Sequence, residues 1–158
     1  MDLILWRHAD ALEGREVEDD MARALSHKGE RQAQRVAHWL NHVLPATTRI
    51  LVSPAVRAQQ TAKALDRKFK TVPALSPEGS VSGLLDAARW PEAREPVLVV
   101  GHQPALGLTA AYLLAGIDVD AANPWRIKKG GVWWLRCRER PDTGPEVMLV
   151  TVRSPDFL

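Results

Sequence analysis

Short apolar runs alternate with amphipathic stretches along this chain, and the alternation constrains the fold more than any other feature. Leu3–Trp6, Arg49–Val52 and Pro96–Val100 each have the length of a strand, and the last, PVLVV, is typical of a strand buried on both faces. Strand followed by helix, repeated, predicts parallel strands joined by right-handed crossovers. We therefore predict a three-layer α/β fold with helices on both faces of a mostly parallel central sheet.

Two helices are predicted in the first half of the chain. Apolar residues recur at helical spacing over Ser26–Leu44, where Ser26 is a suitable N-cap and Pro45 a suitable stop. A second helix is predicted to start at Ser53, as N-cap, with Pro54 at its first position, and to continue at helical spacing as far as Phe69.

The second half is patterned less evenly. Thr71–Trp90 has only loose periodicity, and we predict no helix or strand there. Ala105–Ala115 is predicted to be a helix that Gly116 ends. Val132–Cys137 and Val147–Val152 are predicted to be two late strands that pair with each other.

Length and charge limit the kind of protein this can be. The 158 residues predict a single domain spanning 1–158, and 46% hydrophobic with 25% charged residues is typical of a globular protein. The net charge is only +2, and no block of like charges indicates a nucleic-acid partner.

The compartment can be predicted from three further observations. Cys137 is the single cysteine, so an intramolecular disulfide is impossible and a reducing compartment is expected. The N-terminus has no basic signal region, and the apolar runs are too short to span a bilayer. We expect a cytoplasmic protein with no membrane partner.

Three of the predicted strands lead directly into an arginine or a histidine. The first strand ends in Arg7 and His8, the second leads into a helix whose first turn holds Arg57, and the PVLVV strand precedes His102. Because parallel strands end at one edge of a sheet, and ligands bind beyond that edge, these four side chains are predicted to face one crevice.

The four side chains suit a tetrahedral anion. A cation in the first helical turn, such as Arg57, opposes the partial positive charge of the helix, so an anion is expected to compensate. Helix N-termini near Ser53 and Gln103 would add backbone donors. The forked donors of two arginines fit a phosphoryl group.

Two histidines at such a site indicate phosphoryl transfer. A neutral imidazole can attack phosphorus, while a neighbouring imidazole can stabilise a phosphoryl oxygen as a cation. Phosphoryl transfer requires mainly positioning and charge stabilisation, so two arginines and two histidines suffice without a metal or other cofactor.

Four motifs in this order resemble the histidine phosphatase superfamily, which shares the fold of phosphoglycerate mutases, and within it the small bacterial phosphohistidine phosphatases of the SixA type. These motifs are RHAD at Arg7–Asp10, RALSHKGERQA at Arg23–Ala33, SPAVRAQQTA at Ser53–Ala62 and VLVVGHQP at Val97–Pro104. The resemblance implies that His8 is the nucleophile and becomes transiently phosphorylated. It also implies that Arg7, Arg57 and His102 cradle the phosphoryl group, with Arg23 at the entrance.

The chain departs from the family pattern at three places. Ala9 replaces the glycine that commonly follows the Arg-His pair, and Gly14 stands near the place of a phosphate-binding asparagine. The glutamate with which larger relatives protonate an alkoxide has no clear match, since Glu78 and Asp10 are the only weak candidates. An imidazole leaving group has a conjugate-acid pKa of about 6.5 and needs little such help.

The leading hypothesis is a metal-independent phosphatase that acts on phosphohistidine in a signalling protein, such as a histidine-containing phosphotransfer domain. Glu78–Pro96 is too short for a large lid, which favours a protein substrate. A phosphatase of small phosphate esters or nucleotides, and a module that recognises phosphate without catalysis, remain as alternatives. The oligomeric state is left open.

Several other residues have a simpler explanation. His38 and His42 have the spacing of a helical metal-binding pair, but HWLNH lacks the adjacent glutamate and a solvated face is expected. Trp133 and Trp134 should point to opposite faces of a strand, where core packing is favoured over docking of a partner. KKGG at Lys128–Gly131 is explained by a basic turn before a strand.

Overall fold

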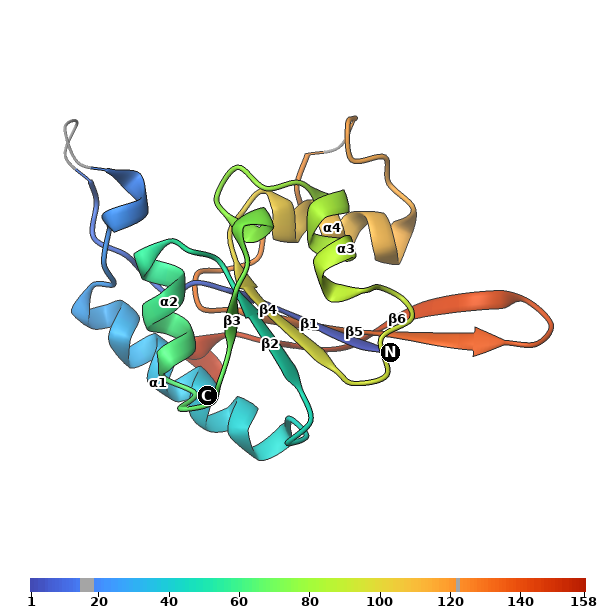
Figure 1. The fold of residues 1–158 in the computed structure, drawn as a ribbon, viewed down its shortest axis with the longest axis horizontal. Helices are drawn as coiled ribbons and strands as arrows, with labels where there is room; N and C mark the ends of the chain where they lie inside the picture. The colour runs from blue at the N-terminus through green and yellow to red at the C-terminus, as the bar shows by residue number, and fades with distance from the viewer. Residues whose placement is uncertain (15–18, 122) are drawn as a thin grey trace.

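A single six-stranded sheet organises the protein in the computed structural model, which describes residues 1–14, 19–121 and 123–158 (Figure 1). Its strands lie in the order β3-β2-β4-β1-β5-β6. The strands are β1 (Asp2–Arg7), β2 (Arg49–Val52), β3 (Lys70–Thr71), β4 (Val97–Gly101), β5 (Val132–Arg140) and β6 (Gly144–Arg153). The helices are α1 (His27–Val43), α2 (Val56–Lys63), α3 (Val81–Ala88) and α4 (Ala105–Ala115), with short 3₁₀ turns η1 (Asp20–Ala22), η2 (Pro73–Leu75) and η3 (Pro155–Phe157).

The sheet combines a parallel part and an antiparallel part. Strands β3, β2, β4 and β1 are mutually parallel, in agreement with the predicted parallel sheet. Strands β5 and β6 form an antiparallel hairpin beside β1, which confirms that the two late strands pair and makes the sheet mixed. The hairpin extends beyond the rest of the sheet (Figure 1).

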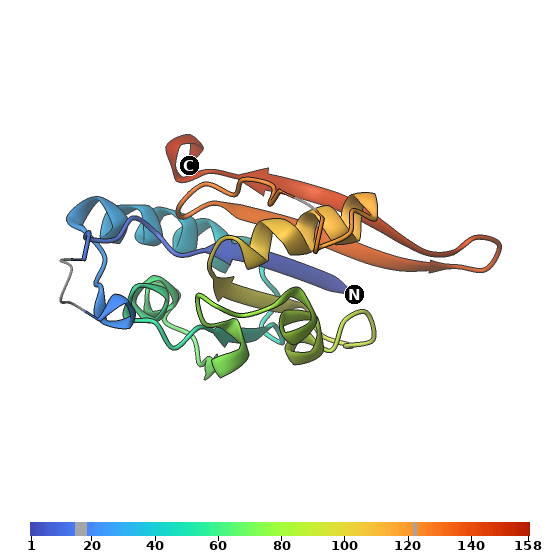
Figure 2. The same ribbon diagram turned by 90° about the horizontal axis from the view of Figure 1, so that it is seen from above.

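Each face of the sheet is covered by two helices, as the three-layer prediction requires. In Figure 1, α3 and α4 lie above the strands and α1 and α2 toward the lower left, and Figure 2 views the molecule from the side of α3 and α4. Alternate residues of β1 point to opposite sides: Ile4 and Trp6 lie in a core with α1 and α2, and Leu3 and Leu5 in a core with α3 and α4. All four are fully buried. Each such side chain contributes about 1.5–3 kcal/mol on burial, so β1 is fixed from both sides.

Helix α1 forms as its sequence predicts. Ser26 is its N-cap, with its side chain accepting a hydrogen bond from the Gly29 N–H, and Leu44 is the C-cap just before Pro45. Its buried residues include Val36 and Leu40 of the predicted apolar stripe.

Helix α2 is shorter than predicted at both ends. Its N-cap is Ala55, because the hydroxyl of Ser53 instead accepts from the Ala55 N–H at 3.2 Å and bonds to a histidine. The helix ends at Lys63, and Asp66 takes a left-handed φ of 53°. The chain has to turn there to enter β3, so the apolar residues toward Phe69 pack against the core without being helical.

Helix α3 lies in Thr71–Trp90, the segment in which no helix or strand is predicted from the sequence. Its buried residues are Val81, Leu84 and Ala88, at positions i, i+3 and i+7, and Ser80 caps its start. The helix covers one face of the sheet and is part of the core. Its short length, eight residues, hid this periodicity among the neighbouring turns.

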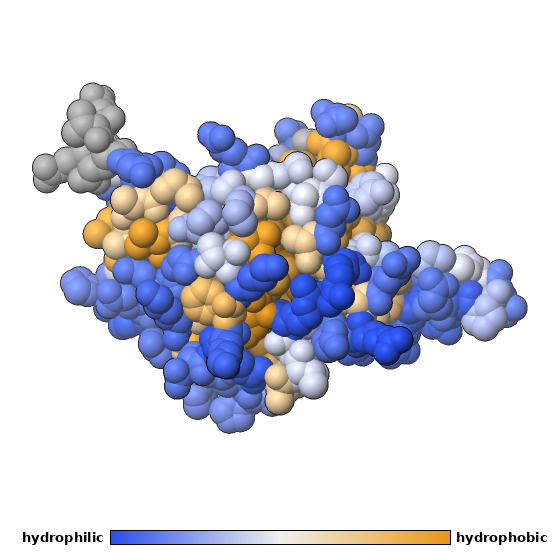
Figure 3. All heavy atoms as spheres, in the orientation of Figure 1, coloured by the Kyte–Doolittle hydropathy of each residue, from blue (hydrophilic) through white to orange (hydrophobic). Residues whose placement is uncertain are grey.

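Trp133 and Trp134 point to opposite faces, as predicted. Trp134 is in the core with α1 and α2, and Trp133 packs against the other core beside Trp125. On the molecular face in Figure 3, hydrophobic residues are visible at the left, in the centre and at the upper right, with hydrophilic residues between and around them. None of the helices in the described residues combines the length and the apolar character needed to cross a membrane.

Candidate active site

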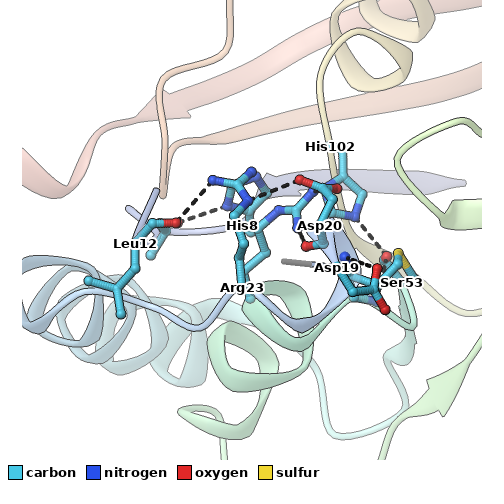
Figure 4. A network of polar contacts seen from close by, with 11 residues as sticks. His8, Leu12, Asp19, Asp20, Arg23, Ser53 and His102 are labelled. Atoms are coloured by element: carbon cyan, nitrogen blue, oxygen red, sulfur yellow. Dashed lines mark hydrogen bonds and ion pairs between the residues drawn. The ribbon is translucent and has the colours of Figure 1, made fainter. Parts of the chain in front are cut away.

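The ends of β1 and β4 bring the two histidines together. The strands are parallel neighbours with Arg7 opposite Gly101, and the His8 N–H donates to the Gly101 carbonyl at 3.0 Å. His8 and His102 follow directly, and their ring centroids lie 5.1 Å apart. Their exposed fractions are only 7% and 4%. The predicted convergence of these strand ends is therefore observed (Figure 4).

A single hydrogen bond determines which nitrogen of His8 is available. Nδ1 of His8 lies 2.8 Å from the carbonyl oxygen of Ala9. A carbonyl oxygen can only accept, so Nδ1 carries the proton and donates it. In the neutral ring, Nε2 then keeps its lone pair, as a nucleophile requires.

His102 is held by Ser53 at the end of β2. Nε2 of His102 lies 2.7 Å from the hydroxyl of Ser53, a fully buried residue. Ser53, predicted as a helix N-cap, therefore positions an imidazole at the site. Among the described residues, Nδ1 of His102 has no hydrogen-bond partner.

Both histidines are neutral in the free protein near pH 7. Burial, together with the charges of Arg57, Arg7 and Arg23, lowers the pKa of His8 to about 4. Burial, and repulsion from the His8 ring once that ring is protonated, lower the pKa of His102 to about 3. The expected cationic partner is therefore uncharged in this state, because both rings are removed from water beside several cations.

Arg57 lies at the site with its terminal nitrogens engaged by Asp20. The side chain is 4% exposed, and it donates to the Asp20 backbone oxygen at 2.7 Å and to the Asp20 carboxylate at 3.0 Å. Arg23 donates to the other carboxylate oxygen at 2.9 Å (Figure 4). Asp20 thus joins the two arginines, and an incoming anion has to share Arg57 with it or displace it.

Asp20 is the residue of this site that was missed from the sequence. Bonds from Arg57 and Arg23 lower its pKa although burial alone would raise it, so it is a carboxylate near pH 7. It lies in the short turn η1 and does not follow a strand. The adjacent charge pattern, Asp20 three residues before Arg23, was the available signal.

Arg7 is held by the segment that precedes β5. Its terminal nitrogen donates to the Ile127 carbonyl at 2.8 Å, and its backbone N–H donates to Gly131 at 3.0 Å. The Gly130 N–H donates to the backbone oxygens of both Arg7 and His8, and the Gly130 oxygen accepts from the indole of Trp6. The KKGG turn therefore supports the end of β1 through its backbone.

Thr61, in the SPAVRAQQTA motif, connects the first strand end with α2. Its buried hydroxyl accepts from the Ala9 N–H at 3.1 Å and donates to the Arg57 carbonyl at 2.7 Å. The loop that carries His8 is thereby fixed to the helix that carries Arg57.

The two weak candidates for a general acid differ in their surroundings. Asp10 accepts from the Ser26 hydroxyl at 2.6 Å and pairs with Lys129 at 3.3 Å, and both bonds lower its pKa, so it is a poor proton donor. Glu78 is exposed on the short segment before α3.

The two positions that replace family residues are accommodated differently. Among the described non-glycine residues, positive φ occurs at Asp66 and Arg89, so the backbone at Ala9 does not require a glycine. A Cβ at Gly14 would lie 3.1 Å from the Arg23 side chain. Gly14 therefore leaves room for Arg23 beside Asp20.

Other predicted positions lie away from this chemistry. Gln103 caps the Gly107 N–H of α4 at 2.9 Å with its own side chain, so that donor is already satisfied. His38 and His42 are exposed on α1, and the described residues contain no cluster of three or more His, Cys, Asp or Glu that could hold a metal.

Comparison with known proteins gives consistent similarities. The profile of the histidine phosphatase superfamily (branch 1) matches residues 3–78. An uncharacterized protein of Picosynechococcus is 33% identical over 168 residues, and the match covers 100% of this chain and 99% of that protein. The phosphohistidine phosphatase SixA of Escherichia coli is 33% identical over 125 residues, covering 73% of this chain and 76% of that protein.

Among solved structures, the putative phosphohistidine phosphatase SixA from Agrobacterium tumefaciens has a similar fold. It matches with a TM-score of 0.78 at 22% sequence identity, over 98% of this chain and 97% of that one. The fold similarity extends over both the parallel strands and the hairpin, whereas the family profile ends before β4.

Proposed function

Because the chain belongs to the histidine phosphatase superfamily and is a phosphatase of the SixA type, we propose that it dephosphorylates phosphohistidine on a signalling protein through a phosphorylated His8. The observation that carries this proposal is the buried pair of neutral imidazoles, His8 and His102, beside Arg57. We propose a histidine-containing phosphotransfer domain as the partner and the cytoplasm as the location.

In the first step, Nε2 of His8 attacks phosphorus. A bond forms between Nε2 and phosphorus while the bond from phosphorus to the substrate imidazole breaks. The substrate ring is protonated from solvent at its other nitrogen, so it leaves as a neutral imidazole whose departing nitrogen keeps the electron pair. The hydrogen bond from Nδ1 to Ala9 orients the ring for this attack. The lowered pKa of His8, about 4, keeps the nucleophile unprotonated near pH 7.

The cationic side chains stabilise the charge of the transferring group. Arg57 and Arg7 supply forked donors, and Arg23 adds charge at the entrance. A dianionic phosphoryl group raises the pKa of His102 from its value in the free protein, which favours donation of a hydrogen bond to phosphate oxygen.

In the second step, water attacks the phosphoryl group on His8. The bond from phosphorus to Nε2 breaks, inorganic phosphate leaves, and the neutral imidazole is restored. The arginine charges perform the stabilisation that a metal ion provides in other phosphoryl-transfer enzymes, so a chelator should leave activity intact.

The leaving group favours phosphohistidine over an ester. Asp10 and Asp20 both have lowered pKa values and are poorly suited to protonate an alkoxide. An imidazole departs readily because its conjugate acid has a pKa of about 6.5. The segment between Glu78 and Pro96 packs into the core through α3 and is too short to form a large lid, which favours a protein substrate.

The test compares a phosphorylated phosphotransfer domain, a phosphohistidine peptide and small phosphate esters, in the presence of a chelator. We expect the highest kcat/KM for the phosphorylated domain and trapping of labelled phosphate on the wild type. His8→Ala should abolish both, while His27→Ala, at an exposed histidine on α1, should retain both.

Three outcomes would contradict the proposal. Full activity of His8→Ala would exclude the phosphoenzyme mechanism. Faster turnover of small esters would indicate the ester or nucleotide phosphatase. Stoichiometric binding of the phosphorylated domain without phosphate release would indicate a recognition module.

A further inference from the structure

A basic pocket lies beside Arg7, at the same edge of the sheet as the two histidines. It has a volume of about 580 Å³, and four parts of the chain line it: the end of β1, the start of α1, the segment before β5, and η3 with its cap. Arg7 lines this pocket and also lowers the pKa of His8 by its charge. Arg7 therefore links the pocket to the candidate phosphoryl site.

Cations outnumber carboxylates in this pocket. Lys129 pairs with Asp10 at 3.3 Å and Lys128 with Asp156 at 3.8 Å. Among the described residues, the remaining cations of the lining have no carboxylate partner. These are Arg7, Lys28 and Arg126.

Two of these cations, Arg7 and Arg126, repel each other. Burial and the charge of Arg126 lower the pKa of Arg7, so the two guanidinium groups are close enough to interact. Arg7 is anchored to the neighbouring residue, Ile127, at 2.8 Å. Lys28 lies in the first turn of α1, where the helix dipole also disfavours a cation. An anion in the pocket would relieve both of these unfavourable interactions.

Arg7 also carries a donor that no protein group satisfies. Within the described part of the chain, the buried Nε of Arg7 has no hydrogen-bond partner, although leaving such a donor unpaired costs free energy. The pocket also offers the neutral side chains of Gln32 and Ser154, which can orient an acceptor.

We propose that this pocket, lined by Arg7, Lys28 and Arg126, binds a second anionic group of the substrate, next to the phosphoryl group that is transferred. For the phosphoprotein substrate proposed above, on which this inference rests, the second group is an acidic side chain near the phosphohistidine. The same chemistry would accept a second phosphate on a small molecule, and the two sources require separate measurements.

The first measurement uses two phosphohistidine peptides that differ only in their flanking residues, aspartates in one and asparagines in the other. Wild type should have the higher kcat/KM for the acidic peptide. Lys28→Ala and Arg126→Ala should each reduce this preference about fivefold, the effect of losing one partly exposed charge contact. The preference should also decrease with salt.

Matched variants remove the same charges elsewhere. Lys68→Ala and Arg138→Ala are exposed and outside the pocket lining, and they should keep the full preference. An equal loss in these controls, or an undiminished preference in Lys28→Ala and Arg126→Ala, would overturn the inference.

The second measurement separates this inference from the proposed function. Binding of propanediol monophosphate and bisphosphate is titrated in the His8→Ala background, where turnover is prevented. If the peptides are not hydrolysed, the proposed function fails. If in that case the bisphosphate still binds more tightly than the monophosphate, and Arg126→Ala removes this difference, the pocket holds a second phosphate. If neither pair of ligands shows a preference, the pocket is not a binding site.

Discussion

The parallel strands and the antiparallel hairpin of one sheet contribute to the candidate site in different ways. β1, β2 and β4 end at a common edge, and the residues that follow them include His8, Ser53 and His102. The hairpin β5–β6 contributes none of these side chains. The turn before it holds the end of β1 by backbone bonds from Gly130 to Arg7 and His8. Parallel strands gather side chains at one edge, and the hairpin supports them.

The largest expected effect distinguishes an arginine on the parallel side from one on the hairpin. Arg57→Ala removes a buried donor from the phosphoryl site and should reduce kcat/KM about a thousandfold. Arg138→Ala removes an exposed arginine of β5 and should stay within about twofold of wild type. Steady-state kinetics on phosphohistidine peptide checks both, and similar losses in the two variants would end the distinction.

The second effect is a dependence of stability on pH that arises at the parallel edge. The folded pKa values of His8 and His102, about 4 and about 3, lie below the usual 6.5, so the unfolded chain binds more protons between these values. Stability is therefore lost as pH falls below 6.5, by up to about 1.4 kcal/mol per pH unit for each histidine.

Urea denaturation between pH 6.5 and pH 4.5 measures this slope. The carboxylates with lowered pKa values, such as Asp2, lose their contribution mainly at lower pH. His8→Ala should roughly halve the slope of the free energy of unfolding against pH. An unchanged slope would mean that the pKa of His8 is not lowered by folding.

The third effect compares two glycines that both have positive φ. Gly130 (φ 74°) supports β1, and a Cβ there would lie 2.9 Å from Pro155, whereas Gly144 (φ 77°) lies in the hairpin with open space around it. Gly144→Ala should lower the free energy of unfolding by about 1 kcal/mol and leave activity normal. Gly130→Ala should lower the free energy of unfolding by about 2–3 kcal/mol and reduce activity about tenfold, because it displaces the backbone of Arg7 and His8.

Thermal denaturation and kcat/KM, measured on both alanine variants, check this comparison. Normal activity in Gly130→Ala would show that the turn before the hairpin does not position the site.

The smallest effect concerns the carboxylate that shares Arg57. Asp20→Asn removes a negative charge that competes with phosphate. It keeps one side-chain acceptor and places an NH2 donor at the other oxygen position, so one of the contacts to Arg57 and Arg23 is also lost. Inhibition by inorganic phosphate should become about fivefold tighter. Weaker inhibition would show instead that the charge of Asp20 is needed to hold the arginines in place.

Much of the parallel part of the fold could be predicted because each element has a local signal. The runs at β1, β2 and β4 are long enough and apolar enough to identify, and α1 has both a cap and a periodic stripe. The convergence of His8 and His102 followed from the rule for parallel strand ends, and the Arg57 position from the same rule.

The remaining features depend on contacts between distant residues. Helix α3 is too short for its three buried residues to stand out, and the start of α2 was misplaced because Ser53 bonds to His102, 49 residues away. Asp20 joins the site through Arg57, across 37 positions of sequence. Burial, which lowers both histidine pKa values, likewise becomes visible only in the folded chain.

The bond from His8 to its neighbour's carbonyl has a consequence for the regiochemistry of the reaction. An imidazole can be phosphorylated at either nitrogen, which gives two positional isomers. With Nδ1 occupied by the Ala9 oxygen at 2.8 Å, only the isomer substituted at Nε2 can form without breaking that contact. Phosphorus NMR of the trapped protein should therefore contain one phosphoimidazole resonance, that of the Nε2 isomer.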